Sequence, residues 1–191
     1  MNNLIDKLKE INKVYYTIND LIKISGYSKE SLFVTLSRLV NQKRLLRLAS
    51  GIYILEDNSN KVDFIANTIY SPSYLSFESA LSRYGILSQS VYILTFATQK
   101  KSLKKILGNI EVEYRQINKS LFGDYKKDGE LLIATPEKAL LDSLYFVSWG
   151  KMQLSLKSLD LKEINKSMII NLSKKFPLRT RRLLDSVLKD K

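Results

Sequence analysis

One short segment of the chain carries four hydrogen-bonding side chains at helical spacing. They are Ser31, Thr35, Arg38 and Gln42, and residues three or four apart share one face of a helix. Hydroxyl and amide groups, together with the forked guanidinium of an arginine, match the donors and acceptors that base pairs present in the major groove of DNA. The spacing therefore predicts a helix that reads DNA bases, with a plain solvent-exposed helix face as the alternative.

Two helices are needed to hold this face outward. The first begins after Thr17, which forms a capping-box pattern with Asp20, and ends at Gly26, because glycine adopts a left-handed helix end at low cost. The second covers about residues 29–42 and begins after Ser28, a typical N-cap residue. Its apolar face consists of Leu32, Leu36, Leu39 and Val40.

A basic hairpin follows these helices. Residues 44–48 and 52–55 are typical of two strands joined by residues 49–51, and residues 2–12 are typical of a preceding amphipathic helix. Together these segments predict a winged helix-turn-helix; the alternative is helices and a hairpin that only pack together. The residues predicted to contact DNA are Ser28, Lys29, Ser31, Thr35, Arg38, Gln42, Lys43, Arg44, Arg47 and Tyr53.

Within this set the expected roles differ. Arg38 has the reach and geometry to bind guanine. Lys43, Arg44 and Arg47 lead into the hairpin and are expected to meet phosphates, which positions a protein on DNA without specifying sequence. Tyr53 either reaches the DNA backbone or packs beneath the hairpin.

The composition excludes several kinds of catalysis. The chain has 191 residues and contains neither cysteine nor histidine, which excludes disulfides, thiol nucleophiles, Ser-His-Asp triads and imidazole-bound zinc. A metal site made only of carboxylates, and a lysine or tyrosine acting as acid or base, stay open. No apolar run approaches the ~20 residues of a membrane span, and the N-terminus lacks a signal-peptide stretch. We therefore expect a cytoplasmic protein without a membrane partner.

The positive charge is spread along the whole chain. A formal charge of +12, from 31 basic and 19 acidic residues, favours an anionic partner such as nucleic acid. Residues 131–191 hold 12 Lys or Arg against six Asp or Glu and are the most basic part. The predicted helix-turn-helix alone does not account for the charge.

The chain is expected to divide at the polar, turn-prone stretch of residues 56–60. We place a winged helix-turn-helix domain at residues 1–58 and a second domain at residues 61–191. The predicted fold class is α+β, with a small antiparallel sheet and C-terminal helices in the second domain. In that domain the pattern predicts helices at residues 62–70, 77–84, 136–147 and twice within 167–189, and strands near residues 91–97, 110–117, 121–125 and 130–134.

Three segments of the chain together resemble a known family. They are G-I-Y-I-L at residues 51–55, Y-L-S-F-E-S-A-L-S-R-Y-G-I-L at 74–87, and A-T-P-E-K-A-L-L-D at 134–142. With them the chain resembles the AbiEi antitoxins of the bacterial AbiE abortive-infection systems, over about residues 4–185. Winged helices are common among regulators, so the second and third segments carry most of the specificity of this resemblance.

The resemblance implies a protein with two tasks. The winged helix would bind inverted repeats in its own promoter and repress transcription. The second domain would neutralise a toxin with a nucleotidyltransferase fold, without a stable complex, in the manner called type IV. We expect no cofactor.

A basic cluster near the C-terminus could serve either task. Its members are Lys174, Lys175, Arg179, Arg181 and Arg182. The alternatives are contact with the DNA backbone, with the toxin, with RNA on which the toxin acts, or a purely solubilising role.

Two rival function classes stay open. One is a winged-helix regulator whose second domain senses a ligand. The other is a nucleic-acid enzyme, for which Glu111-Val112-Glu113-Tyr114-Arg115 approximates a two-acid nuclease pattern with arginine in place of lysine. The chain has only seven glycines and no glycine-rich phosphate loop, so we expect no enzymatic activity.

Overall fold

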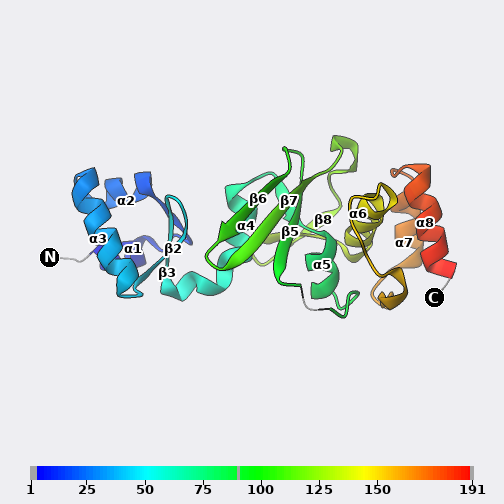
Figure 1. Ribbon diagram of the computed structural model, residues 1–191, viewed down its shortest axis with the longest axis horizontal. Helices are drawn as coiled ribbons and strands as arrows, with labels where there is room; N and C mark the ends of the chain where they lie inside the picture. The colour runs from blue at the N-terminus through cyan, green and yellow to red at the C-terminus, as the bar shows by residue number, and fades with distance from the viewer. Residues whose placement is uncertain (1–3, 90, 190–191) are drawn as a thin grey trace. The chain divides into compact units, whose positions relative to one another are not determined.

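The computed structural model describes residues 4–89 and 91–189 and shows a mixed α+β protein (Figure 1). Within these residues the chain forms eight α-helices and two β-sheets. Its contacts group into two compact units, one made of Met1–Ala66 and Ile106–Ile110, the other of Asn67–Lys105 and Glu111–Lys191. Among the described helices, none has the length and apolar character that crossing a membrane requires.

The first unit combines helices with a three-stranded antiparallel sheet in which β3 lies between β1 and β2. Residues 2 and 3 of the predicted first helix lie outside the described residues. The elements in order are α1 (Leu4–Ile11), β1 (Tyr16–Thr17), α2 (Ile18–Ser25), α3 (Lys29–Asn41), β2 (Leu45–Ala49), β3 (Ile52–Leu55), the 3-10 helix η1 (Glu56–Lys61) and the start of α4 (Val62–Ile69).

The ends of α2 and α3 follow the predicted capping chemistry. The Thr17 hydroxyl accepts from the backbone N–H of Asp20, and the Asp20 carboxylate accepts from the backbone N–H of Thr17 at 2.9 Å, so the capping box is confirmed. Gly26 ends α2 with φ of 69°, in the left-handed region that favours glycine. Ser28 caps α3 by accepting from the backbone N–H of Ser31. Local sequence therefore determines where α2 begins and ends and where α3 begins.

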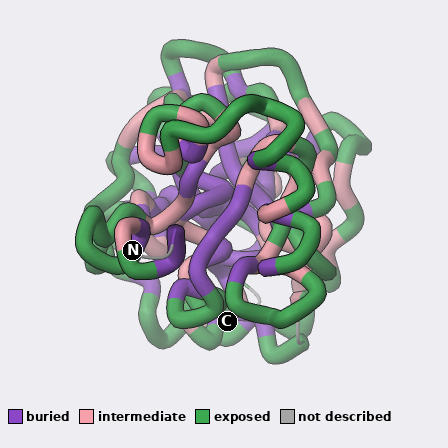
Figure 2. Tube along the Cα trace, turned by 90° about the vertical axis from the view of Figure 1, so that its left-hand side faces the viewer, coloured by how far each residue is buried: buried purple, intermediate pink, exposed green. Residues whose placement is uncertain are grey.

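The core of the first unit is built on the apolar faces of its helices. Leu32, Leu36 and Leu39 of α3 are at most 1 % exposed, and Val40 packs at the edge of the same core. They meet buried residues of α1, α2 and the sheet, namely Leu4, Ile5, Leu8, Tyr16, Leu21, Leu45, Tyr53 and Leu55. Figure 2 shows buried stretches of the trace inside exposed turns. This packing fixes which face of α3 points outward.

The stretch predicted as a domain boundary is itself ordered structure. Residues 56–61 form η1, and Asn58 is buried. The Asn58 amide donates to the backbone carbonyls of Lys13 and Val14 at 3.4 and 3.3 Å. These hydrogen bonds hold η1 against the first unit, whose contacts extend to Ala66.

The second unit is built around a six-stranded sheet with the order β6-β7-β5-β4-β9-β8. The strands are β4 (Ser73–Leu75), β5 (Ile93–Thr98), β6 (Leu103–Leu107), β7 (Ile110–Gln116), β8 (Tyr125–Asp128) and β9 (Leu131–Ala134). The helices are the end of α4, α5 (Phe77–Arg83), α6 (Pro136–Ser148), α7 (Lys166–Ser173) and α8 (Leu178–Lys189), with 3-10 helices η2 (Lys119–Leu121) and η3 (Leu156–Ser158).

The expectation of a small antiparallel sheet in the second part is wrong. The sheet is mixed, because β5 pairs with β7 and β4 pairs with β9 in parallel, whereas β4–β5 and β8–β9 are antiparallel. The strand predicted near residues 121–125 is also misplaced, because β8 covers Tyr125–Asp128. Strands β4 and β6 were not predicted at all. The three residues of β4 are too few to show a period of two, and β6 has Lys104 and Lys105 at its centre. Parallel pairing also depends on crossover connections, which local patterns do not specify.

The helices of the second unit form a layer around α6. Thr135 caps α6 and Pro136 is its first residue, as predicted. Helix α6 packs against α5, α7 and α8, and Figure 1 shows α6, α7 and α8 close together. Ten of its 13 residues are buried, so α6 is the central helix of this unit.

Candidate nucleic-acid interface

Helix α3 turns most of the predicted DNA-contacting residues toward solvent. Its apolar residues are fixed in the core, so the residues on the opposite face are exposed. The exposed members of the predicted set are Ser28, Lys29, Ser31, Arg38, Gln42, Lys43, Arg44 and Arg47. They come from consecutive parts of the first unit, namely the N-cap of α3, α3 itself, the turn after it and β2.

The hydroxyl groups of the predicted stripe have local partners. Ser28 caps the helix and also donates from its hydroxyl to the Ser31 hydroxyl at 3.1 Å. Thr35 is half-buried, and its hydroxyl donates to the backbone carbonyl of Ser31 at 2.9 Å. Hydroxyl groups engaged in this way retain lone pairs, but their orientation is set by the helix. Arg38 and Gln42 therefore carry the freest polar groups of the stripe.

Tyr53 lies in the interior of the first unit. Only 5 % of its surface is exposed, and it belongs to the core cluster that includes Leu32 and Leu36. The reason is its place on β3, the middle strand of the sheet, which has neighbours on both sides. Of the two roles considered for Tyr53, packing beneath the hairpin agrees with this position, and we leave Tyr53 out of the interface.

Five cations of this region have no ionic partner among the described residues. They are Lys29, Arg38, Lys43, Arg44 and Arg47, named below the α3–β2 basic group. Elsewhere in the first unit, Lys13 pairs with Asp20 at 2.9 Å and Lys9 lies 3.9 Å from Asp57. Burial alone would raise the pKa of Asp20, but hydrogen bonds from Lys13 and Thr17 outweigh it and lower the pKa to about 2. The basic group thus offers exposed cations that form no ion pair with a described carboxylate.

The outermost residues of α3 lie on a stripe beside the one predicted from the sequence. A hollow of about 730 Å³ on this face is lined by Phe33, Val34, Ser37, Arg38, Asn41 and Gln42. Val34, Ser37 and Asn41 were not predicted to contact DNA, although all three are exposed. The signal for them is the position of the buried leucines, because residues about 180° around the helix from a buried face point outward.

In the second unit, two segments of the family resemblance meet in a buried polar network. Tyr74 and Ser76 come from β4 and the residue after it, and Lys138 and Asp142 come from α6. Lys138 forms an ion pair with Asp142 and donates to the Tyr74 hydroxyl at 2.8 Å. The hydroxyls of Tyr74 and Ser76 donate to Asp142 at 3.0 and 2.9 Å.

This network is closed to solvent. Tyr74, Ser76, Lys138 and Asp142 are each 0 % exposed. Complete burial raises the pKa of the Asp142 carboxyl, against the lowering influence of Lys138, Ser76 and Tyr74. Every group has a partner, as buried polar side chains require. The network ties β4 to α6, which is a structural role.

The arginine of the acidic pattern on β7 binds the glutamates around it. Arg115 forms a two-pronged ion pair with Glu78 at 2.6 and 3.2 Å and also pairs with Glu113 at 2.8 Å. Burial would raise the pKa of Glu113, but Arg115 and Lys104 lower it overall. In the described part of the chain, no three acidic residues gather where they could hold a metal ion.

The members of the C-terminal basic cluster make varied contacts within the second unit. Lys175 pairs with Asp124 at 3.1 Å, and Lys174 donates to the side-chain carbonyl of Asn171 at 3.3 Å. The guanidinium of Arg179 lies 5.8 Å from the centre of the Trp149 ring. The remaining two members differ, since Arg181 is half-buried with its Nε enclosed and Arg182 is exposed.

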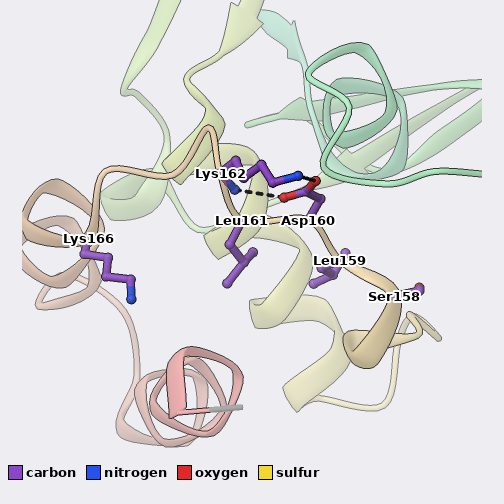
Figure 3. A pocket seen from close by; sticks show the side chains of 6 residues that line it. All are labelled: Ser158, Leu159, Asp160, Leu161, Lys162 and Lys166. Atoms are coloured by element: carbon purple, nitrogen blue, oxygen red, sulfur yellow. Dashed lines mark hydrogen bonds and ion pairs between the residues drawn. The ribbon is translucent and has the colours of Figure 1, made fainter. Parts of the chain in front are cut away.

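A second hollow, of about 520 Å³, lies beside the segment between η3 and α7 (Figure 3). Its lining residues are Ser158, Leu159, Asp160, Leu161, Lys162 and Lys166. Lys162 pairs with Asp160 at 3.0 Å, while Lys166 extends from the start of α7 away from that pair (Figure 3). Among the described residues, Lys166 forms no ion pair, in contrast to Lys162.

No protein-family model matches the chain, and no curated protein matches it in sequence.

Proposed function

We propose that the chain is a DNA-binding transcriptional autorepressor and the antitoxin of a type IV, AbiE-like toxin–antitoxin system. In this proposal the first unit is a winged helix-turn-helix that binds inverted repeats in its own promoter. The second unit neutralises a nucleotidyltransferase-like toxin without a stable complex, and the protein acts in the cytoplasm.

The observation that carries the DNA-binding part is the α3–β2 basic group. Its five cations are exposed and lack ionic partners among the described residues, and they flank a helix face with free amide and guanidinium groups. An α-helix with side chains is about 10–12 Å across, and the major groove is about 12 Å wide. Helix α3 would enter the groove, while Lys43, Arg44 and Arg47 would bind phosphates on either side of it.

The antitoxin part rests on the family resemblance. What supports it in the fold is that the second unit has its own sheet and helical layer, and so can carry a task of its own. The resemblance segments at residues 74–87 and 134–142 meet in the buried network of Tyr74, Ser76, Lys138 and Asp142. Their residue types are explained by the architecture of this unit, so a toxin-facing surface is to be sought among its exposed residues.

The DNA-binding part is tested by titrating the full chain with its own promoter duplex and with a scrambled duplex. We expect specific binding to the promoter. Arg38→Ala should cost roughly 1–3 kcal/mol and relax discrimination at one position of the site, because a bidentate arginine reads a single guanine. Arg83→Ala is the matched control, since Arg83 is exposed in the second unit and pairs with Asp128 at 3.1 Å. Equal affinity for both duplexes would contradict the proposal.

The antitoxin part is tested by growth under induction of the neighbouring toxin gene. The full chain, expressed from an unrelated promoter, should rescue growth, and Arg38→Ala should rescue equally, because neutralisation is assigned to the second unit. A soluble chain that fails to rescue would contradict the antitoxin role while leaving DNA binding intact. Release of the chain from DNA by a small molecule would instead support the rival class of ligand-sensing regulators.

A further inference from the structure

The outer face of α3 carries an apolar residue that folding does not explain. Val34 is 73 % exposed, and it lies two residues from both Leu32 and Leu36, which are buried. At about 100° per residue, this spacing points Val34 almost directly away from the core. A β-branched residue in this position gains no burial and is a weak helix former. Its presence is therefore better explained by something that α3 contacts.

Asn41 lies on the same stripe as Val34, with Ser37 and Arg38 between them, and all four line the hollow on this face. Seven residues of helix rise about 10.5 Å, which is close to three base-pair steps of about 3.4 Å each. The side-chain amide of Asn41 makes no hydrogen bond to another described residue and is exposed. Along the stripe, α3 therefore presents the apolar side chain of Val34, the guanidinium of Arg38 and the amide of Asn41, in that order.

Each of these groups matches one feature of the major groove. The thymine methyl is the apolar group that base pairs present there, and aliphatic side chains contact it. An asparagine amide binds adenine at N6 and N7 in a two-pronged manner, and arginine binds guanine. The three side chains together match a site that contains a thymine, a guanine and an adenine.

The charge around Val34 argues against a second copy of this chain as the occupant. Two copies meeting through this face would bring two α3–β2 basic groups together, and like charges disfavour such a symmetric contact. Five cations without described ionic partners attract a polyanion instead.

We propose that Val34 contacts a thymine methyl and that Asn41 binds an adenine, so that the two residues determine sequence preference beside Arg38. This inference rests on the proposed DNA-binding function and names the chemistry of the site it reads.

The test uses the full chain and its promoter duplex in which single thymines are replaced by uracil, which lacks only the methyl group. We expect one position of the half-site at which replacing a single thymine by uracil weakens binding about fourfold, the equivalent of one buried methyl. Val34→Ala should bind the thymine and uracil duplexes equally at that position. Ile11→Ala is the matched control, because Ile11 is a β-branched residue that is 48 % exposed on α1.

A second arm tests Asn41 with 7-deazaadenine, which lacks the N7 acceptor. We expect one adenine position to lose affinity on this replacement in the native chain and to be insensitive in Asn41→Ala. Circular dichroism of each variant establishes that the helices are intact.

The outcomes separate the inference from the function on which it rests. If the native chain discriminates the promoter from a scrambled duplex but is indifferent to every uracil and 7-deazaadenine replacement, the inference is overturned and the DNA-binding function stands. If the native chain binds the promoter and the scrambled duplex equally, both the inference and the proposed DNA-binding function are overturned. If Val34→Ala instead lowers the mass of the free protein by light scattering, with no change in thymine dependence, Val34 belongs to a contact between copies and the inference is again overturned.

Discussion

The two basic regions of the chain differ in what their side chains touch. In the α3–β2 basic group, Lys29, Arg38, Lys43, Arg44 and Arg47 are exposed and have no ionic partner among the described residues. In the C-terminal basic cluster, Lys175 is paired with Asp124 and Arg179 lies over Trp149. Each region contributes five cations to the charge of the chain. The cations of the first region form no ion pairs with described residues, whereas some cations of the second contact residues of their own unit.

Other cations of the second unit also have local roles. Lys138 is buried, and Arg115 joins two glutamates. The outer strands of the six-stranded sheet, β6 and β8, carry the lysine pairs Lys104-Lys105 and Lys126-Lys127. Lysines on an edge strand discourage pairing with strands of other molecules. A charge of +12 therefore does not by itself locate an anion-binding surface; cations that form no ion pair with a described residue are the more informative signal.

The largest expected effect concerns the buried lysine of the second unit. Lys138→Met leaves the Asp142 carboxylate buried without its counter-charge, and we expect a loss of about 3–5 kcal/mol in the free energy of unfolding. Urea denaturation followed by circular dichroism measures it. Promoter affinity should be unchanged under conditions where the protein is folded, because Lys138 is inaccessible.

The control for this change is Lys151→Met, at an exposed lysine shortly after α6, which should alter stability little. The double variant Lys138→Met/Asp142→Leu should lose less than Lys138→Met alone, because no unpaired charge remains. A native-like stability of Lys138→Met would show that the pair is not structural.

The next effect compares the two basic regions directly. Reversal of Lys43, Arg44 and Arg47 to Glu should lower promoter affinity roughly a hundredfold and reduce the slope of log K against log salt by about 2.7, at about 0.9 per phosphate. Reversal of Lys174, Lys175 and Arg182 makes the same change in net charge and should have a much smaller effect. Titrations between low and physiological salt measure both. Equal losses of affinity would show that DNA contacts both basic regions.

Much of the first unit could be predicted because its signals are local. The capping box of Thr17 and Asp20, the glycine end at Gly26 and the N-cap Ser28 all act within four residues of the chain. The mixed sheet could not, because strands β4 and β9 are adjacent in space but far apart in sequence.

The candidate site, too, depends on contacts that local sequence does not specify. The stripe predicted from helical spacing included Thr35, which is half-buried, and left out the neighbouring stripe that contains Val34 and Asn41, which are exposed. The direction of a helix face depends on which residues the rest of the fold buries. The burial of Lys138 was missed for a related reason: its ion-pair partner Asp142 is four residues away, but Tyr74, which accepts its other hydrogen bond, lies 64 residues away.

A smaller effect tests how α2, the helix before the interface helix, is held. Asp20→Asn removes the carboxylate that accepts from the backbone N–H of Thr17 and from Lys13, and we expect a loss of about 1 kcal/mol at neutral pH. The pKa of Asp20 is lowered to about 2 in the folded protein, below its unfolded value of about 3.9. Its contribution is therefore complete above about pH 4 and is lost as the pH falls through 2.

Thermal unfolding between pH 2 and pH 7 measures this contribution. The native chain should lose it on acidification, whereas Asp20→Asn should lack that component of the pH dependence. Asp57→Asn is the control, because Asp57 is exposed and its contact with Lys9 is 3.9 Å long. Parallel pH profiles for the native chain and Asp20→Asn would contradict this role of Asp20.

The smallest effect separates charge from backbone geometry at one position of the α3–β2 basic group. Lys43 ends the turn after α3 with φ of 56°, in the left-handed region that favours glycine. Lys43→Gly therefore removes a cation without disturbing the turn, and its stability should equal or slightly exceed that of the native chain. Lys43→Ala removes the same cation but keeps a strained side chain, so it should be the less stable of the two.

On DNA the two variants should behave alike. If Lys43 binds a phosphate, both reduce the salt slope by about 0.9 and weaken promoter and scrambled duplexes by the same factor, because a phosphate contact carries no sequence information. This pattern is the opposite of that expected for Arg38→Ala, which should affect the promoter more than the scrambled duplex. An unchanged salt slope in Lys43→Gly would remove Lys43 from the interface and confine the phosphate contacts to the remaining cations of the group.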